Sequence, residues 1–241
     1  MIEQISDQEF KDFLSLQTDK VKRNVTIVTP RSLGQNFFLH IDPEKTPKEF
    51  IPMMPRSAAT SEDNTVPRIT VADTLRGCMQ GWGRMLHSFH EWQTVGLHIC
   101  KLEFDFALKP NRKLVFDAEE TGECWLVTYN VDTRKYKPVN IGKLFLHKVG
   151  YTFVEKLKRT IAVGDVYMEI FSDDLVRVNN KISVTKGYYK LEIALMEKER
   201  QDPLEILNCI KMEKKDYNKA KSISASTLDT TCVNIPLYQN W

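Results

Sequence analysis

Alternating hydrophobic and polar residues predict most of the regular structure in this chain. In the run VGLHICKLEFDFAL, residues 95–108, apolar side chains alternate with Lys101, Glu103 and Asp105, which is typical of a half-buried strand. Shorter runs have the same strand-like character, and they cover residues 25–30, 35–41, 68–72, 113–118, 123–131 and 139–149. Because the first two of these runs lie close together, we expect a hairpin or two neighbouring strands there.

Helical periodicity marks two segments of the first half. A helix is expected from Ser6 or Asp7, with Phe10 and Phe13 on one side. Another is expected after residues 73 and 74, either of which can cap it.

The second of these helices contains glycine at an unusual density. Gly77, Gly81 and Gly83 lie inside its periodic pattern. Each should cost about 1 kcal/mol relative to alanine in a helix interior. Close packing of this helix against another backbone is therefore expected.

The pattern of apolar and polar residues changes after about residue 150. A short helix is expected over 151–160, and Asn179 with Asn180 fits a two-residue hairpin turn between strands. A further helix is expected over 202–222, with Pro203 at its start and a basic end. Strands are expected over residues 165–171, 175–184 and 187–197.

These elements do not alternate regularly as strand and crossover helix. We therefore predict an α+β fold with a mixed, mainly antiparallel sheet and flanking helices. One domain is expected over residues 1–149, with a β-rich elaboration over 150–241 that could bind a partner. Residues 43–67 contain five prolines and few periodic apolar positions, so this segment is expected to be a functional loop.

Composition excludes few functions, but it bears on where in the cell the protein is found and on what it could bind through overall charge. The 241 residues carry a formal charge of +2, which gives no overall attraction to nucleic acid or to a membrane surface. No stretch approaches the roughly 18 apolar residues that span a bilayer, and the acidic start is unlike a signal peptide. A cytoplasmic location is expected. The five cysteines form no CxxC pair, which favours reduced, buried thiols.

Several kinds of site find little support in the sequence. His87, His90, His98 and Cys100 do not have an established zinc spacing, so no metal is expected. There is no Gly-x-Ser-x-Gly elbow for a serine hydrolase. The glycines of GCMQGWG lie in a helical pattern rather than in a phosphate-binding loop.

Nucleic-acid binding has only local support. Basic and aromatic residues interleave in TRKYKP, TKGYYK and KMEKKDYNKAK, as they do where phosphates are held and bases stack. Solvated turns and a surface helix end have the same composition, so both interpretations stay open.

One set of residues is more suggestive. His40 ends one predicted strand, Arg68 begins a second, and Glu123 begins a third. Such side chains can hydrogen-bond a ribose, pair with a phosphate, or stabilise an oxocarbenium-like centre. The structural alternative is that His40 bonds a loop carbonyl, that Arg68 pairs with Glu62 or Asp63, and that Glu123 caps a strand edge.

The chain also resembles a known but uncharacterised family. The segments FFLHI, FIPMMPRS, EDNTVPRITVADTLRGCMQGW, VFDAEETGECWLV and IGKL, within residues 37–146, resemble small proteins of phages and bacterial mobile elements. Their layout is in turn similar to the ADP-ribosyltransferase superfamily in its broad sense, including the RES-type NAD-degrading toxins. Residues 150–241 match no family that we recognise.

This resemblance implies a role for each residue of the set. His40 would contact the nicotinamide ribose, Arg68 the diphosphate or a ribose, and Glu123 would be the catalytic acid. The chain departs from the pattern at Ile41 and Asp42, where Ser, Thr or Gly is commoner after the histidine, and a central Tyr or Ser is missing.

Two functional hypotheses follow. The first is a cytosolic phage or mobile-element protein that binds NAD or a related nucleotide. It would transfer the ADP-ribosyl group or hydrolyse NAD, acting on host or defence factors. The second is a non-enzymatic inhibitor or adaptor that binds a host protein through its C-terminal half.

Overall fold

A computed structural model describes most of the chain. It covers residues 8–42, 48–55, 62–81, 94–127, 135–154, 159–195 and 204–228. All statements about structure below concern these residues.

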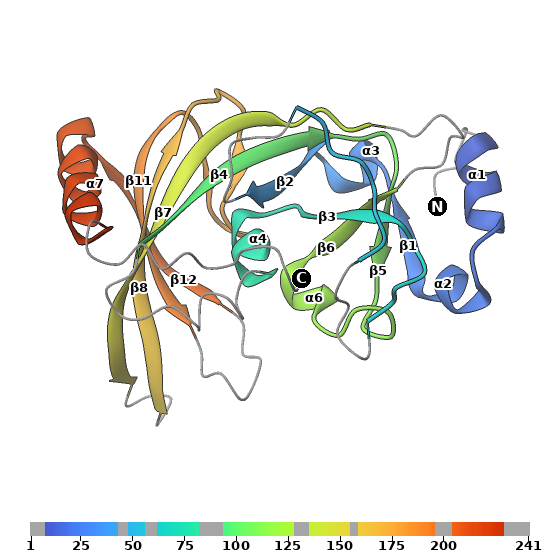
Figure 1. Ribbon diagram of the computed structural model, residues 1–241, viewed down its shortest axis with the longest axis horizontal. Helices are drawn as coiled ribbons and strands as arrows, with labels where there is room; N and C mark the ends of the chain where they lie inside the picture. Colours follow the sequence, from blue (N-terminus) through green and yellow to red (C-terminus); the bar gives the residue numbers. More distant parts are fainter. Residues whose placement is uncertain are drawn as a thin grey trace.

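One long antiparallel sheet dominates the fold (Figure 1). Its ten strands lie in the order β1-β5-β6-β3-β2-β4-β7-β8-β11-β12. Their bounds are β1 Val25–Val28, β2 Phe37–Asp42, β3 Arg68–Ala72, β4 Thr94–Glu103, β5 Ala107–Pro110, β6 Glu123–Val127, β7 Val139–Val154, β8 Arg159–Ile170, β11 Gly187–Leu195 and β12 Glu205–Met212. A separate two-stranded hairpin joins β9, Val176–Arg177, to β10, Ser183–Val184. The prediction of an α+β fold with a mainly antiparallel sheet is confirmed.

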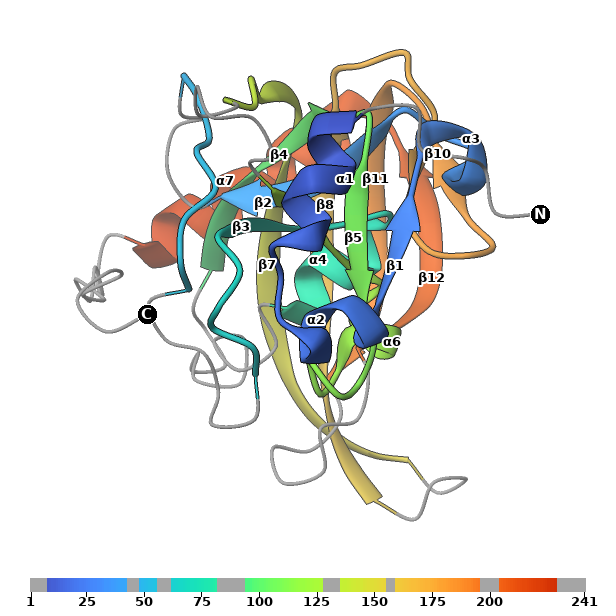
Figure 2. The ribbon, with the colours of Figure 1, turned by 90° about the vertical axis from the view of Figure 1, so that its right-hand side faces the viewer.

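The helices are short and lie beside the sheet. Their bounds are α1 Gln8–Ser15, α2 Asp19–Asn24, α3 Pro30–Leu33, α4 Leu75–Gly81, α6 Ala118–Thr121 and α7 Lys214–Leu228. Figure 1 shows α7 at one end of the molecule and α1 with α2 at the other. In Figure 2, α1 and α2 lie in front of β1 and β5.

Strand β6 is buried on both faces of the sheet. Trp125 and Val127 pack in a cluster with Phe10 of α1, whereas Cys124 and Leu126 belong to a second cluster with strand residues. All five residues of β6 are buried as a result. The charged residue of this strand, Glu123, therefore lies in a largely apolar environment.

The sheet is nearly interrupted between β2 and β3. Only one residue pair, Leu39 with Ala72, joins these two strands. By contrast, β2 pairs with β4 over six residues and β3 pairs with β6 over five. Next to this seam, Met53 forms an isolated bridge with Arg68 on the same edge of β3. The seam leaves backbone groups of both strands free to meet side chains or a ligand.

Several predicted elements are wrong. Strands β1 and β2 are not neighbours, because β5, β6 and β3 lie between them. Residues 113–118 form turns and the start of α6 rather than a strand. Leu114 and Val115 are buried there while their amides donate to the Asn111 carbonyl.

The predicted helices of the second half also need correction. Of the helix expected over 151–160, residues 151–154 and 159–160 instead form the paired ends of β7 and β8, and residues 155–158 lie outside the described ranges. The described part of the helix expected over 202–222 contains strand β12 followed by the first residues of α7. A hairpin at Asn179 and Asn180 is confirmed between β9 and β10, but its turn is longer than the two residues expected, because the amide of Val178 donates to the Ile182 carbonyl and residues 179–181 lie between them.

The expected boundary at residues 149 and 150 falls inside strand β7. The strands that follow it, β8, β11 and β12, extend the same sheet. One hydrophobic cluster contains Leu39 and Ile99 from one side of that boundary and Val166 and Leu191 from the other. Within the described residues, the two parts therefore share a sheet and a core.

Candidate functional site

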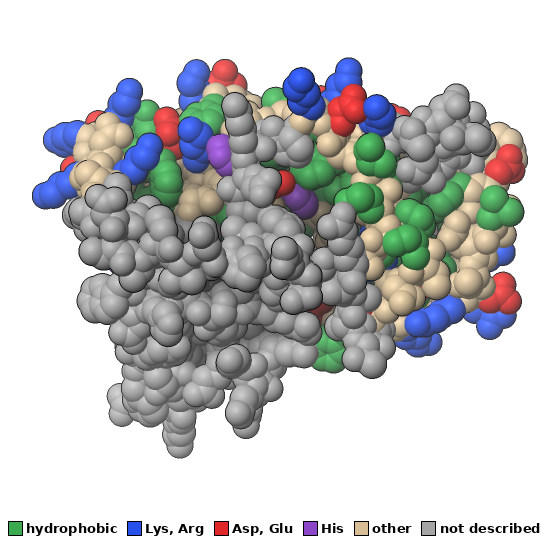
Figure 3. Space-filling model, viewed as in Figure 1, with side chains coloured by type: hydrophobic (Ala, Val, Ile, Leu, Met, Phe, Trp, Pro, Cys, Tyr) green, Lys and Arg blue, Asp and Glu red, His purple; other side chains and the backbone are tan. Residues whose placement is uncertain are grey.

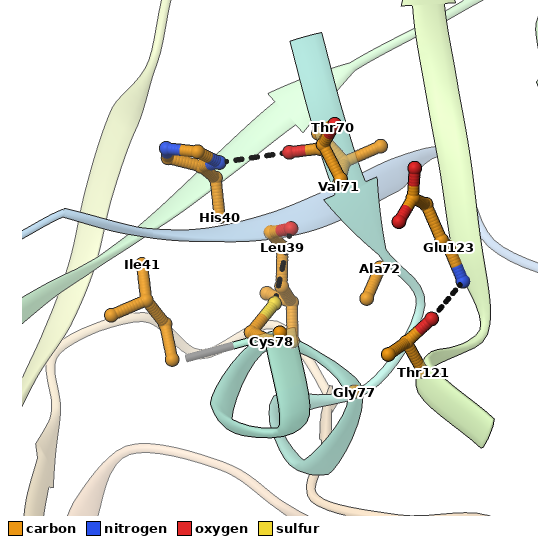
Figure 4. A pocket seen from close by; sticks show the side chains of 11 residues that line it. Leu39, His40, Ile41, Thr70, Val71, Ala72, Gly77, Cys78, Thr121 and Glu123 are labelled. Carbon is orange, nitrogen blue, oxygen red and sulfur yellow. Dashed lines mark hydrogen bonds between the residues drawn. The ribbon is translucent and has the colours of Figure 1, made fainter. Parts of the chain in front are cut away.

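A pocket lies at the seam between β2 and β3. It has a volume of about 170 Å³, and helix α4 and the end of α6 close its lower side (Figure 4). Its apolar wall includes Leu39, Ile41 and Ala72. Polar side chains that line it are His40, Thr70, Thr121 and Glu123. Two of the three residues singled out from the sequence, His40 and Glu123, therefore line one pocket although they come from non-adjacent strands.

His40 spans the seam with its side chain. Its Nδ1 atom donates a hydrogen bond to the Thr70 carbonyl of β3 over 3.0 Å, so the ring partly replaces the missing ladder between the strands. The edge of the ring meets Phe50 with 4.9 Å between centroids. Burial lowers the pKa of His40, while the Thr70 carbonyl and Asp42 oppose that shift. The neutral imidazole is favoured, with Nε2 as an acceptor.

Glu123 provides the acidic group of the pocket. The residue is 8% exposed, and its Oε1 atom accepts a hydrogen bond from Trp125 Nε1 over 2.6 Å. Burial raises the pKa of Glu123 to about 7, although the Trp125 hydrogen bond and the Arg68 charge act in the opposite direction. At neutral pH the group is present in both protonation states, which is what a general acid or base requires.

Arg68 does not line the pocket. Its side chain is buried and its Nη2 atom pairs with Glu62 Oε1 over 2.8 Å. Its Nη1 atom donates to the Asp63 carbonyl, also over 2.8 Å. The guanidinium group lies 4.2 Å from the centre of the Trp125 ring. The structural alternative weighed for Arg68, pairing with Glu62 and Asp63, is the arrangement observed.

Helix α4 closes the pocket through a close backbone approach. A Cβ atom at Gly77 would lie 2.0 Å from the Thr121 carbonyl oxygen and 2.9 Å from Ala72 Cβ. The expectation that a glycine in this helix permits close packing is thus confirmed at Gly77. The Thr74 hydroxyl accepts a hydrogen bond from the Gly77 amide, as expected of a capping residue.

Two side chains of the site were missed by sequence reasoning. Cys78 lines the pocket and its Sγ atom donates to the Leu39 carbonyl over 3.2 Å, and burial raises the pKa of this thiol. Trp125 contacts both Glu123 and Arg68. The spacing of Glu123 and Trp125, two residues apart on a strand, was the available signal, because such residues share a face.

The described residues contain no cluster of three or more potential metal ligands. The ring of His98 instead makes a hydrogen bond of 3.1 Å with the Asn140 amide, and Cys100 is buried. His87 and His90 lie outside the described residues. Among the described residues, Cys78, Cys100, Cys124 and Cys209 form no disulfide, and the first three of them are buried.

Most tyrosine rings of the three basic and aromatic segments, TRKYKP, TKGYYK and KMEKKDYNKAK, are buried. Tyr136, Tyr189 and Tyr217 are at most 7% exposed, so these rings are not available to stack on bases. Figure 3 shows Lys and Arg side chains gathered at the α7 end. Those of α7 itself are exposed, and they are Lys214, Lys215, Lys219 and Lys221. Helix α7 therefore presents positive charge, but its tyrosine, Tyr217, is buried and cannot stack on a base.

Comparisons with protein-family models, with curated proteins and with solved structures found no match for this chain. No helix within the described ranges has the length and apolar character needed to cross a membrane.

Proposed function

We propose that the pocket at the β2–β3 seam binds the nicotinamide end of NAD or of a related nucleotide, and that the protein transfers the ADP-ribosyl group or hydrolyses NAD. The observation that carries this proposal is the position of His40 and Glu123 on one pocket. The resemblance to ADP-ribosyltransferases supports the choice of ligand.

The pocket suits a ring better than a phosphate. The residues that line it include no Lys or Arg, and its acidic residue favours a cation or a hydrogen-bond donor. Its volume of about 170 Å³ lies below the range of roughly 300–1,000 Å³ that is common for whole drug-sized ligands. A pyridinium carboxamide with part of its ribose fits these limits, and the remainder of the nucleotide would lie outside.

The chemistry that follows uses two side chains. The bond between ribose C1′ and the nicotinamide nitrogen breaks, and its electron pair stays on that nitrogen. Nicotinamide leaves as a neutral molecule. Water, or a nucleophilic side chain of a target protein, attacks C1′ and loses a proton, which the Glu123 carboxylate accepts. The free Nε2 atom of His40 accepts a hydrogen bond from a ribose hydroxyl. Arg68 receives no ligand contact in this scheme, because Glu62 and Asp63 already bind its guanidinium group.

The experiment is an incubation of the full chain with labelled NAD and host lysate. We expect the wild type to release nicotinamide and to yield free or protein-bound labelled ADP-ribose. Glu123→Gln keeps the shape of the side chain, and it should lower the rate by about 100-fold or more. Absence of both nicotinamide release and labelled product with the wild type would exclude the enzyme.

A second candidate has its own supporting observation. Strand β12 is the last strand of the sheet, and Leu207 and Ile210 on it are 57% and 42% exposed. Exposed apolar residues on a terminal strand favour the alternative, a non-enzymatic protein that binds a host protein through its C-terminal half. A host protein retained by the wild type but lost with Leu207→Lys and Ile210→Lys would support it. Equal retention by all three chains would argue against this surface.

A further inference from the structure

Trp125 lies between a buried charge and the acid of the pocket. Its indole N–H donates to Glu123 over 2.6 Å, and the Arg68 guanidinium group lies over its ring at 4.2 Å. Trp125 is fully buried, and Arg68 and Glu123 are 6% and 8% exposed. The three residues come from adjacent strands, β3 and β6, which pair so that Thr70 stands opposite Trp125.

We propose that Trp125 and Arg68 are positioning residues for Glu123, the first by fixing one carboxyl oxygen and the second by holding the indole and supplying a buried positive charge. An indole nitrogen only donates, so it bonds the carboxylate more strongly than the neutral acid. A guanidinium group stacked on an indole face is held there by cation–π attraction. A role of this arrangement in catalysis rests on the proposed function. The contacts among the three residues are independent of it.

The segment before β3 adds a second influence on Glu123. Glu62 and Asp63 bind Arg68, and the negative charge of Glu62 raises the pKa of Glu123 while the Arg68 charge lowers it. Asp117, at the start of α6, also raises it. His40 of β2 and Cys78 of α4 face the same pocket, and burial favours the neutral form of each. The charge felt by Glu123 therefore depends on how tightly this acidic segment binds Arg68.

These contacts predict that two variants, Trp125→Phe and Glu62→Gln, shift the titration midpoint of Glu123 in opposite directions. Trp125→Phe keeps an aromatic ring but removes the N–H donor, so the titration midpoint of Glu123 should rise by about one pH unit. Glu62→Gln removes a negative charge from the vicinity of Arg68 and Glu123, so the midpoint should fall. The Glu62 side chain is 26% exposed, and glutamine keeps an oxygen that can accept a hydrogen bond from Arg68, so the buried guanidinium group retains a partner in this second variant.

The measurement is a carbon-13 NMR titration of glutamate carboxyl groups in the full chain, with the Glu123 signal assigned from its absence in Glu123→Gln. It needs no nucleotide, so its outcome is separate from that of the NAD assay. Tyr136→Phe is the matched control, because it removes a buried hydrogen bond of 2.9 Å to the Val127 carbonyl on the same strand. The control should leave the midpoint unchanged.

An unchanged midpoint in Trp125→Phe would overturn the role of the indole. If that variant does not fold, Glu62→Gln decides, and a midpoint that stays constant or rises would overturn the role of Arg68 and its acidic partners. Where NAD cleavage is observed, the lower limb of its pH profile should move in the same directions as the midpoints.

Discussion

Glu123 links the pH of the solution to the stability of the fold. Burial raises its pKa from an ordinary value of 4.5 to about 7. The folded chain therefore binds a proton more tightly than the unfolded chain does. Stability from this residue is fully present below pH 4.5 and is lost as the pH rises through about 7.

Glu123→Gln should remove this pH dependence. Because the variant has no charge to bury, it should equal the wild type near pH 4 and be more stable at pH 8. The difference in the free energy of unfolding should be on the order of 3 kcal/mol, from about 1.4 kcal/mol for each pH unit of the shift. Urea denaturation at both pH values measures it.

Glu103 offers a matched control on strand β4, because its side chain is exposed. Glu103→Gln should leave the free energy of unfolding within about 0.5 kcal/mol of the wild type at both pH values. A Glu123→Gln variant that is no more stable than the wild type at pH 8 would show that the carboxylate is not costly to bury.

At the scale of elements, α4 is the part that fixes the floor of the pocket. Its first turn is capped by Thr74, and Gly77 lets it approach the Thr121 carbonyl. Arg76 extends this contact by donating to the Glu120 carbonyl over 3.1 Å and to the Leu204 carbonyl over 2.7 Å. Helix α4 therefore connects the pocket with α6 and with the segment that starts β12.

Gly77→Ala should separate α4 from α6. An added Cβ atom would lie 2.0 Å from a backbone oxygen, which cannot move as a flexible side chain can. We expect a loss of about 1–3 kcal/mol in the free energy of unfolding, as for other overpacked sites. Ligand binding at the pocket should weaken in parallel.

Gly81→Ala is the matched control in the same helix, because a Cβ atom there meets nothing within 4 Å. It should leave stability unchanged or raise it by up to about 1 kcal/mol. Thermal unfolding of both variants, followed by circular dichroism, makes the comparison. Equal stability of the two alanine variants would contradict the close contact at Gly77.

Sequence patterns predicted several strands near their observed places. The run that contains β4 alternates with a period of two, whereas β2, β3 and β6 were expected from short apolar runs and are mostly or wholly buried. The pattern failed where apolar residues are buried without regular structure, as at Leu114 and Val115. It also could not give strand order, because pairing of β1 with β5 depends on contacts far apart in the chain.

The site was predictable in part for the same reason. His40 and Glu123 were identified because they lie at the ends of predicted strands and have side chains that can bind a ribose or act as an acid, and both line the pocket. Arg68 has the same sequence signature, but its charge is satisfied by neighbours five and six residues away, Asp63 and Glu62. Sequence position alone does not distinguish a ligand contact from a local ion pair. The ADP-ribosyltransferase-like core stays a prediction.

At the scale of the whole molecule, the sheet continues from the N-terminal part into the C-terminal part, so the C-terminal part contributes to the stability of the fold. Strand β7 pairs with β8 from Gly142 to Val154, which crosses the boundary expected from the sequence. The cluster beneath it draws Val166, Met168 and Leu191 from the second part. Removal of that part would expose the inner face of β4 and β7.

A chain that ends at residue 149 should therefore not fold cooperatively. We expect it to lose the sharp urea transition of the full chain and to give a poorly dispersed proton–nitrogen NMR spectrum. The reason is the loss of the buried partners of Leu97, Ile99 and Leu144. A well-dispersed spectrum from the shortened chain would show instead that residues 1–149 are an independent domain.

The single residue pair between β2 and β3 has a mechanical consequence. A hydrogen-bonded ladder fixes the spacing of two strands, but here one side chain spans the seam beside that pair. His40 of β2 bonds the Thr70 carbonyl of β3, whereas Cys78 bonds the Leu39 carbonyl and joins β2 to helix α4, which follows β3. A longer or shorter side chain at position 40 would therefore change the distance between β2 and β3 while the ladders on either side stay intact.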